Sequence, residues 1–118
     1  MNIEEYRDFC LSFAGVSEGF PFGSQTLVFK VMGKMFALTD IDTFEFINLK
    51  CDPERAIILR EQYEEIKPGW HMSKIHWNSV FTHGTLDDEF IKELIIHSYD
   101  IIISGLPKKK KDELNSLR

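Results

Sequence analysis

The first residues of the chain have the hydrophobic pattern of an amphipathic helix that ends near residue 15. Apolar side chains recur at helical spacing, at Ile3, Tyr6, Phe9, Cys10 and Phe13. Asn2 and Glu5 have the spacing of an approximate capping box, in which each side chain bonds the backbone of the other. Glycines at positions 15, 19 and 23, with Pro21 between them, then predict an ordered but irregular loop.

The next pattern is the two-residue alternation of β-strands. In residues 26–31, β-branched and aromatic side chains alternate between two faces, and Lys30 lies on the second face. Gly33 supplies the positive φ that a tight hairpin requires, so residues 34–39 are expected to return as a second strand. After a turn-like segment, residues 44–49 are expected to form a third strand.

The second half of the chain continues with a helix and another strand pair. Asp52 followed by Pro53 is typical of a helix start, and apolar residues continue that helix to about residue 63. A Pro-Gly pair limits residues 66–72 to a short or bulged strand. That segment leads into a fifth strand at residues 75–81, so the pair resembles a second hairpin.

The last long helix is expected to begin at Thr85, because Asp88 follows three residues later. Its buried stripe comprises Phe90, Ile91, Leu94, Ile95, Ile101 and Ile102. Gly105 is the predicted stop. Pro107 and the four lysines at residues 108–111 then begin a basic tail, which has enough apolar residues for one more short helix.

These elements predict an α+β fold, a two-layer sandwich of the order α-β3-α-β2-α with an antiparallel sheet. Strands joined by short turns pair antiparallel, and amphipathic helices bury their apolar stripes against a sheet. A chain of 118 residues has the size of one domain. We expect that domain to span residues 1–106, with residues 107–118 as the basic tail or short helix.

The charges are distributed unevenly along the chain. The formal net charge is −5, which argues against a protein that coats nucleic acid indiscriminately. None of the 19 acidic residues lies in residues 19–39 or in residues 66–86, and we refer to these segments as the two acid-free windows. Each window covers mostly a predicted hairpin, whereas the acidic residues lie mostly on predicted helices.

The sequence lacks the features of an exported or membrane-spanning protein. The N-terminus has two acids within its first five residues and no apolar core of signal-peptide length. The longest apolar runs, residues 35–38 and 56–59, are far shorter than the roughly 20 residues needed to cross a bilayer. We therefore expect a cytoplasmic protein without a membrane partner, in which Cys10 and Cys51 are reduced.

Parts of the two windows have the chemistry of a nucleic-acid contact. Lys30 and Lys34 flank the predicted hairpin turn, where both ammonium groups could reach phosphates. Residues 70–77 combine aromatic stacking surfaces, a cation and imidazoles. The candidate nucleic-acid-binding residues are Lys30, Lys34, Lys67, Trp70, His71, Lys74 and His76.

Each of these residues also has an ordinary structural explanation. Lysines are common on exposed strand faces, where they discourage pairing between sheet edges. Trp77 is expected to face the core with Ile75, while His76 and Asn78 occupy the other face of the strand. For Trp70, beside the Pro-Gly pair, a structural role and a binding role are equally favoured.

Neither a metal site nor an enzyme active site is indicated. The spacing of His71, His76 and His83 matches no compact pair of metal ligands, and we expect no cofactor. The glycine-rich and serine motifs of common enzymes are absent. Ser98 and Tyr99 lack a base partner in the sequence, so we expect them to supply polar contacts beside the buried stripe.

Several strings resemble the MmcQ/YjbR family: PFG at residues 21–23, FKVMGKMFAL at 29–38, LKCDPE at 49–54, KPGWHMSKIHW at 67–77, and the pair Ser98-Tyr99. The resemblance covers nearly the whole chain. It implies the α-β3-α-β2-α fold shared with secretion chaperones, and a DNA-binding protein with a double-wing motif. It supplies no catalytic residue.

Two functional hypotheses follow. The first is a non-enzymatic DNA-binding protein whose two acid-free windows meet as one neutral-to-positive surface, with the four candidate lysines gathered near Trp70 and His71. The second is a protein-interaction or chaperone-like module with an exposed aromatic patch that includes Phe20, Phe22 and Trp70, for which a protein partner or a second copy would be the ligand.

Overall fold

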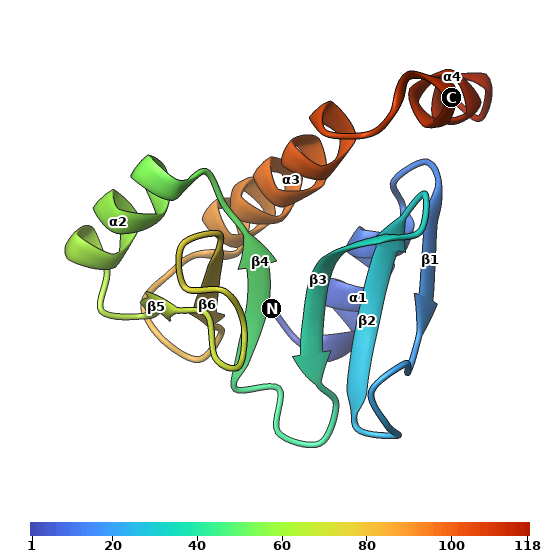
Figure 1. Cartoon of the computed structure of the whole chain (residues 1–118). Coiled ribbons are helices and arrows are strands. Elements are labelled where there is room, and N and C mark those ends of the chain that lie inside the picture. The colour runs from blue at the N-terminus through green and yellow to red at the C-terminus, as the bar shows by residue number, and fades with distance from the viewer.

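A six-stranded antiparallel sheet is the centre of the computed structural model, which describes residues 1–118 (Figure 1). The strand order is β1-β2-β3-β4-β6-β5. The strands are β1 (Val16–Gly19), β2 (Thr26–Val31), β3 (Lys34–Asp40), β4 (Phe46–Lys50), β5 (Ile66–Pro68) and β6 (Trp77–Phe81). The helices are α1 (Ile3–Leu11), α2 (Pro53–Gln62), α3 (Asp88–Ser104) and α4 (Lys108–Ser116).

The two faces of this sheet are covered very differently. Figure 1 shows α1 and α3 packed behind the sheet, and that side holds a core cluster of 22 buried residues. On the opposite side, which we call the open face, no helix lies over the strands, and the buried cluster comprises only Val28, Leu38 and Trp77. The architecture confirms the predicted α+β class with helices packed against an antiparallel sheet.

Local sequence signals set most of the element ends. Asn2 accepts from the backbone N–H of Glu5 and the Glu5 carboxylate accepts from that of Asn2, so the predicted capping box is present. Asp52 caps α2 by accepting from the N–H of Arg55, and Pro53 occupies the first turn. Gly105 ends α3, as its position predicted.

The β2–β3 hairpin forms as expected. Met32 and Gly33 both have positive φ, 49° and 85°, which gives the turn the twist that matches antiparallel strands. Val31 pairs with Lys34 beside the turn. Further along, the register shifts so that Phe36 and Ala37 both enter the helix-side core, a β-bulge in β3.

Three strand predictions were wrong in detail. Residues 16–19 form the edge strand β1 instead of a loop; only β2 pairs with this strand, and Ser17 and Glu18 are exposed. β4 starts two residues late, because Phe44 has a φ of 44° that no strand accommodates. β6 begins at Trp77, since residues 74–76 form a turn.

The start of α3 was also predicted wrongly. Asp87 is the N-cap and accepts from the backbone N–H of Phe90. Thr85 instead donates both its N–H and its hydroxyl to the carboxylate of Glu65, 20 residues earlier in the chain. A long-range partner therefore removes Thr85 from the role that its spacing to Asp88 suggested.

Ser98 and Tyr99 have the structural roles expected of them. The Ser98 hydroxyl is fully buried, donates to the carbonyl of Phe36 and accepts from the N–H of Lys50. It bridges β3 and β4 where their direct pairing ends at Ala37. The Tyr99 hydroxyl donates to the carbonyl of Ala14 at 2.6 Å.

The C-terminal segment is helical and contacts the core. Leu114 of α4 is 1% exposed and lies in the same core cluster as the residues of α1 and α3. A Cβ on Gly15 would come within 2.7 Å of the Leu114 side chain, so this close approach requires glycine. No helix is long and apolar enough to span a bilayer.

Candidate binding site

Strand pairing determines which side chains face the open side of the sheet. The registers align one row across all six strands, comprising Gly19, Val28, Leu38, Asn48, Ser79 and Lys67. Directly paired residues share a face, and every second residue along a strand returns to it. Lys30 therefore lies on the open face with Val28, and Phe46 lies there with Asn48.

The open face contains a pocket of about 460 Å³, which we call the Trp70 pocket. Half of its lining is apolar, and its walls come from both acid-free windows. The lining residues are Phe22, Thr26, Met35, Leu38, Thr39, Asp40, Thr43, Phe46, Asn48, Trp70, His71 and Met72. A partly apolar hollow of this size with a few polar groups is typical of a ligand-binding site.

The loop at residues 69–76, between β5 and β6, forms one wall of the Trp70 pocket. It crosses in front of β4 and β6 (Figure 1) and is bonded to both strands. The Trp70 N–H donates to the Ser79 hydroxyl at 2.9 Å, and its carbonyl accepts from the Asn48 amide at 3.1 Å. A Cβ on Gly69 would meet Trp77 at 2.7 Å, so glycine allows the loop to approach the sheet.

Arg60 of α2 anchors the same loop from outside the pocket. Its guanidinium donates to the carbonyls of Lys74 and Trp77, and to the Asn78 side chain at 2.7 Å. The Lys74 ammonium donates to the carbonyl of Gly69 at 2.6 Å. Lys74 and Trp77 of residues 70–77 thus serve to hold the loop in place. Trp70 and His71 project from the loop, with ring centroids 4.6 Å apart.

The two tryptophans have opposite environments. Trp77 is buried against Val28 and Leu38, as predicted, although on the open side of the sheet. Ile75 is 65% exposed because its segment is a turn, so the expectation that it faces the core was wrong. Asn78 lies on the opposite face of β6 from Trp77, as predicted, and its buried side chain accepts from Arg60. Trp70 is 62% exposed, so it is not part of the core.

The candidate lysines do not line the Trp70 pocket. Lys30 borders a separate hollow together with Glu18, and Lys34 lies beside the hairpin turn. The Lys74 ammonium is bonded within its own loop, and Lys67 borders a pocket with three glutamates. The two windows meet, as predicted, but the pocket that they form is aromatic instead of positive.

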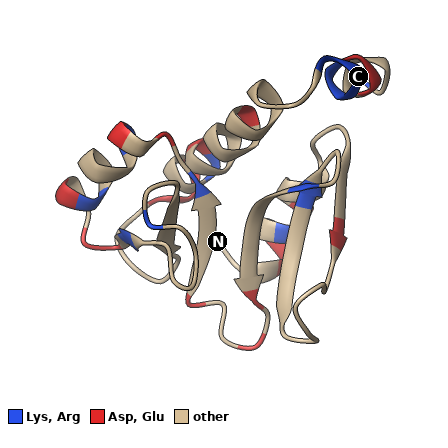
Figure 2. Ribbon diagram, in the orientation of Figure 1, with Lys and Arg blue, Asp and Glu red and all other residues tan.

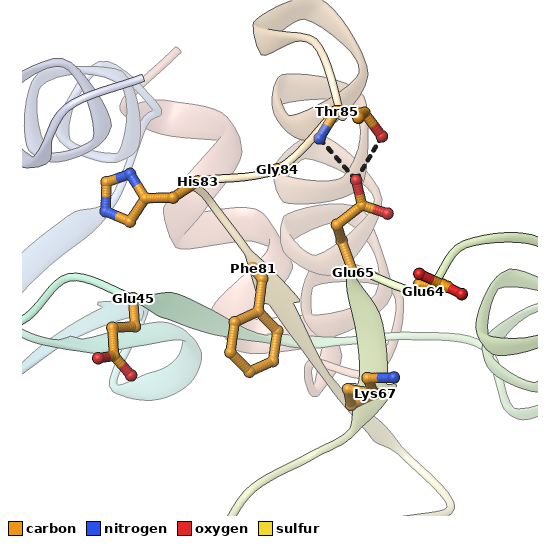
Figure 3. Close-up of a pocket in the computed structure, with 8 residues that line it drawn as sticks. All are labelled: Glu45, Glu64, Glu65, Lys67, Phe81, His83, Gly84 and Thr85. Carbon is orange, nitrogen blue, oxygen red and sulfur yellow. Dashed lines mark hydrogen bonds between the residues drawn. The ribbon is translucent and has the colours of Figure 1, made fainter.

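That second pocket, which we call the Glu65 pocket, has a volume of about 540 Å³ and lies at the β5 edge of the sheet (Figure 3). Its lining comprises Glu45, Glu64, Glu65, Lys67, Phe81, His83, Gly84 and Thr85. Three carboxylates against one lysine make this region unfavourable for a phosphate backbone. Figure 3 also shows that Glu45 and Glu64 point in different directions and do not converge on one point.

Glu65 has a structural role in this pocket. Its carboxylate accepts from the N–H and the hydroxyl of Thr85, at 2.6 and 2.5 Å. These hydrogen bonds, the hydroxyl first, lower the pKa of Glu65. A Cβ on Gly84 would come within 2.5 Å of the Glu65 side chain, so glycine allows the carboxylate to reach Thr85.

The three histidines considered from the sequence lie apart. His71 lines the Trp70 pocket, His83 lines the Glu65 pocket, and the exposed His76 contributes its carbonyl to a hydrogen bond from Cys51. No three His, Cys, Asp or Glu side chains lie close enough together to hold a metal ion. His71 has a positive φ of 56°, an uncommon conformation for a residue other than glycine.

The charges separate broadly by side of the sheet. Figure 2 shows acidic residues mainly on the helices and around the turn between β3 and β4, with Lys30 and Lys67 on strands of the open face. Asp40 at the end of β3 is an exception on the open face, whereas Glu18 of the edge strand pairs with the helix-side Phe29 and is bonded to Arg7 of α1. The candidate lysines do not gather near Trp70 and His71, and three glutamates border the pocket of Lys67, so the two windows do not form the single neutral-to-positive face that was predicted.

The family model described as YjbR matches residues 11–101, a span that includes the sheet, the loop at residues 69–76 and most of α3. The chain belongs to the YjbR family. YjbR of Escherichia coli K12 is 30% identical over 118 residues, covering 99% of this chain and all of that protein. YbdF of Escherichia coli O157:H7 is 39% identical over 90 residues, or 75% of this chain and 74% of that one. Both relatives are named as uncharacterized proteins.

Two solved structures share this architecture. The crystal structure of Deinococcus radiodurans protein DR2400, a DUF419 domain, superposes with a TM-score of 0.90 at 37% identity. The alignment covers 97% of this chain and 88% of that one. A Pseudomonas syringae protein matches with a TM-score of 0.74 at 28% identity, covering 86% and 98% of the two chains.

Proposed function

We propose that this YjbR-family chain is a non-enzymatic nucleic-acid-binding protein that uses the open face of its sheet, with DNA as the first candidate ligand. The observation that carries the proposal is the exposed aromatic pair Phe22 and Trp70 at a pocket where the two acid-free windows meet. Exposed aromatic rings over a sheet offer stacking platforms for unpaired bases. Lys30 and Lys34 lie on or beside this face as candidate phosphate contacts.

The lining of the Trp70 pocket favours binding over catalysis. The Thr39 hydroxyl is buried and donates to the carbonyl of Phe46, so it is not positioned as a nucleophile. Oδ1 of Asp40 accepts from two backbone N–H groups of its own turn, those of Asp42 and Thr43. The polar groups are thus held in place by the fold, as in a preformed recognition site.

Charge limits the affinity that this proposal allows. With a net charge of −5 and carboxylates around Lys67, few phosphates can be neutralised, so we expect weak binding that salt reduces further. Stacking would then contribute more than ion pairing. Single-stranded DNA is therefore expected to bind better than duplex DNA, whose bases are already stacked on one another.

The test is a fluorescence-anisotropy titration of labelled single-stranded and duplex DNA at low salt. Trp70→Ala is expected to weaken single-strand binding about tenfold, because stacking on an aromatic ring contributes about 1–3 kcal/mol per base. The double variant Lys30→Glu/Lys34→Glu should weaken binding and flatten its salt dependence. A matched control, Arg55→Glu/Lys92→Glu, makes the same change in charge on α2 and α3.

Binding that is absent at low salt would overturn the proposal. So would binding that Trp70→Ala leaves unchanged, or that the control pair reduces as much as the lysine pair. Thermal melts of each variant establish that it remains folded, so that a loss of affinity refers to the surface alone.

A second candidate function is supported by the exposed apolar side chains themselves. Phe20, Phe22, Trp70 and Ile75 are 48%, 63%, 62% and 65% exposed, and all four lie in the loops at residues 20–25 and 69–76. Such residues also suit a protein partner or a second copy of the chain. Sedimentation analysis tests self-association: a dimer that Trp70→Ala dissociates would favour this function over nucleic-acid binding.

A further inference from the structure

The Trp70 pocket has two aromatic walls that come from opposite directions. Phe22 lies in the loop before β2, whereas Trp70 lies in the loop bonded to β4 and β6. In the sheet β3 runs between β2 and β4, so the pocket spans β3 with one exposed ring on each side. Met35 and Met72 contribute thioethers to the lining, and such side chains make favourable contacts with aromatic rings. This arrangement suits a flat ligand.

The polar groups that face the pocket are few. Asn48 is 5% exposed, whereas Thr39 pairs with Leu27 and Ile47 of the helix-side core and directs its side chain away from the open face. The Asn48 side chain donates to the carbonyl of Trp70 and accepts from the hydroxyl of Ser79, so its amide is held in a fixed orientation at the pocket. The Asn48 amide would meet the edge of a ligand instead of its face.

Asp40 is the only acidic residue in the lining, and one of its oxygens has no partner. Oδ1 accepts from the backbone N–H groups of Asp42 and Thr43, while no protein donor bonds Oδ2. A free carboxylate oxygen accepts hydrogen bonds and donates none. The group that it prefers is therefore an amino or imino N–H.

No lysine or arginine lines the pocket, which argues against a phosphate as its occupant. A phosphate beside Asp40 would meet a like charge without any compensating cation. Lys30, a candidate on the same face, borders a different hollow. The backbone of a bound strand would thus run outside the pocket, with only an uncharged ring inside.

The wall that carries Trp70 is fixed before any ligand binds. Arg60 bonds the loop from α2, and Gly69 allows its close approach to Trp77. His71 is held at a φ of 56° beside Trp70, and backbone strain of this kind tends to occur at ligand sites. A preformed wall lowers the entropy lost on binding.

We infer that the Trp70 pocket holds one unpaired nucleobase, stacked against Trp70 and Phe22, and that Asp40 accepts a hydrogen bond from its exocyclic amino group. This inference rests on the proposed function. Cytosine presents an N4 amino group to such a carboxylate, whereas thymine and uracil present a carbonyl oxygen at the same position. The site should therefore prefer cytosine to thymine.

The experiment compares labelled oligo-dC and oligo-dT of equal length at low salt, with free cytidine and uridine titrated separately and followed by amide and indole NMR shifts. The wild-type chain should bind oligo-dC about fivefold or more tightly than oligo-dT, the lower end of the discrimination expected for a specific base contact. Asp40→Asn should abolish or reverse that preference. The amide keeps an oxygen for the N–H groups of Asp42 and Thr43 but replaces the free acceptor with a donor.

The matched control is Asp42→Asn. It removes the same charge two residues further along the chain, from a side chain that does not line the pocket. It should leave the preference for cytosine unchanged. Shifts of the Trp70 indole and of the amides at residues 69–72 with cytidine, but not with uridine, would place the base in the pocket.

The outcomes separate this inference from the proposed function. Binding of the oligonucleotides without a base preference, or an equal effect of Asp40→Asn and Asp42→Asn, overturns the nucleobase site while the proposed DNA-binding function stands. NMR shifts on adding cytidine, without binding of the oligonucleotides, support the nucleobase site and overturn the proposed function. No response to either oligonucleotides or nucleosides overturns both proposals, as does a dimer whose interface covers Trp70.

Discussion

The two faces of the sheet are built from the same strands but are stabilised in different ways. Behind the sheet, α1 and α3 cover one continuous apolar core in which Tyr6, Phe29 and Phe36 are fully buried. On the open face, the short loop at residues 69–76 covers only part of the strands, and hydrogen bonds from Arg60 and Asn48 hold it. Burial therefore stabilises the fold on one side, while the other side retains exposed aromatic rings.

The largest expected difference between the faces comes from removing one phenyl ring on each side. Phe36→Ala deletes a fully buried ring that contacts Phe13 and Tyr99, and it should lower the free energy of unfolding by about 3–5 kcal/mol. Phe22→Ala deletes the same group from a 63% exposed position and should change stability by less than about 0.5 kcal/mol. Urea denaturation measures both values.

An effect of Phe22→Ala comparable to that of Phe36→Ala would contradict the division between the two faces. The two variants are matched in chemistry, so only the environment of the ring differs. The m-value should stay the same in both, because neither change alters the surface exposed on unfolding by much.

A smaller effect is expected from releasing the loop on the open face. Arg60→Ala removes the bonds to Lys74, Trp77 and Asn78 and should cost about 1.5–3 kcal/mol, the range for hydrogen bonds to charged groups. Hydrogen exchange should accelerate most at the amides of residues 69–77. Arg55→Ala on the same helix is the control, since no side-chain hydrogen bond or salt bridge involves the Arg55 guanidinium. Equal exchange in the two variants would show that Arg60 does not hold the loop.

The smallest expected effect concerns pH at the Glu65 pocket. Hydrogen bonds from Thr85 lower the pKa of Glu65 below its ordinary value of 4.5. The stabilisation by the Glu65 carboxylate is therefore fully present above about pH 4.5 and is lost as the pH falls through the lower pKa of the folded state. The stability difference between wild type and Glu65→Gln should shrink on acidification below about pH 4.5. Denaturation midpoints between pH 3 and pH 7 test this prediction, and a difference that grows at low pH would contradict it.

Local signals predicted much of the fold because they act within a few residues. The capping box of Asn2, the helix start at Asp52 and the turn at Gly33 each depend on neighbours in the chain, and all three form as expected. The strand at Ser17 was missed because its residues do not alternate and only β2 pairs with it. Thr85 was misassigned because Glu65, 20 residues away, takes its donors.

The candidate site was predicted only in part. Trp70 and His71 were singled out by their chemistry, and both line the pocket, whereas the part played by Asp40 and Asn48 was not foreseen. Alternation indicates that Asn48 and Phe46 share a strand face, but only the register places that face beside the loop at residues 69–76. The role of Lys74 as an internal tether depends equally on how that loop folds back.

The sequence by itself determined most of the elements, the family and the uneven distribution of acidic residues, because periodicity, caps and composition are properties of adjacent residues. The tertiary structure alone decided that Phe22 and Trp70 lie at one pocket, that Lys67 lies among glutamates, and that Trp77 is buried on the open side. These facts follow from the strand order, which places β3 between β2 and β4 and brings the two windows together over it. Strand order is set by contacts between residues far apart in the chain, and no local pattern encodes it.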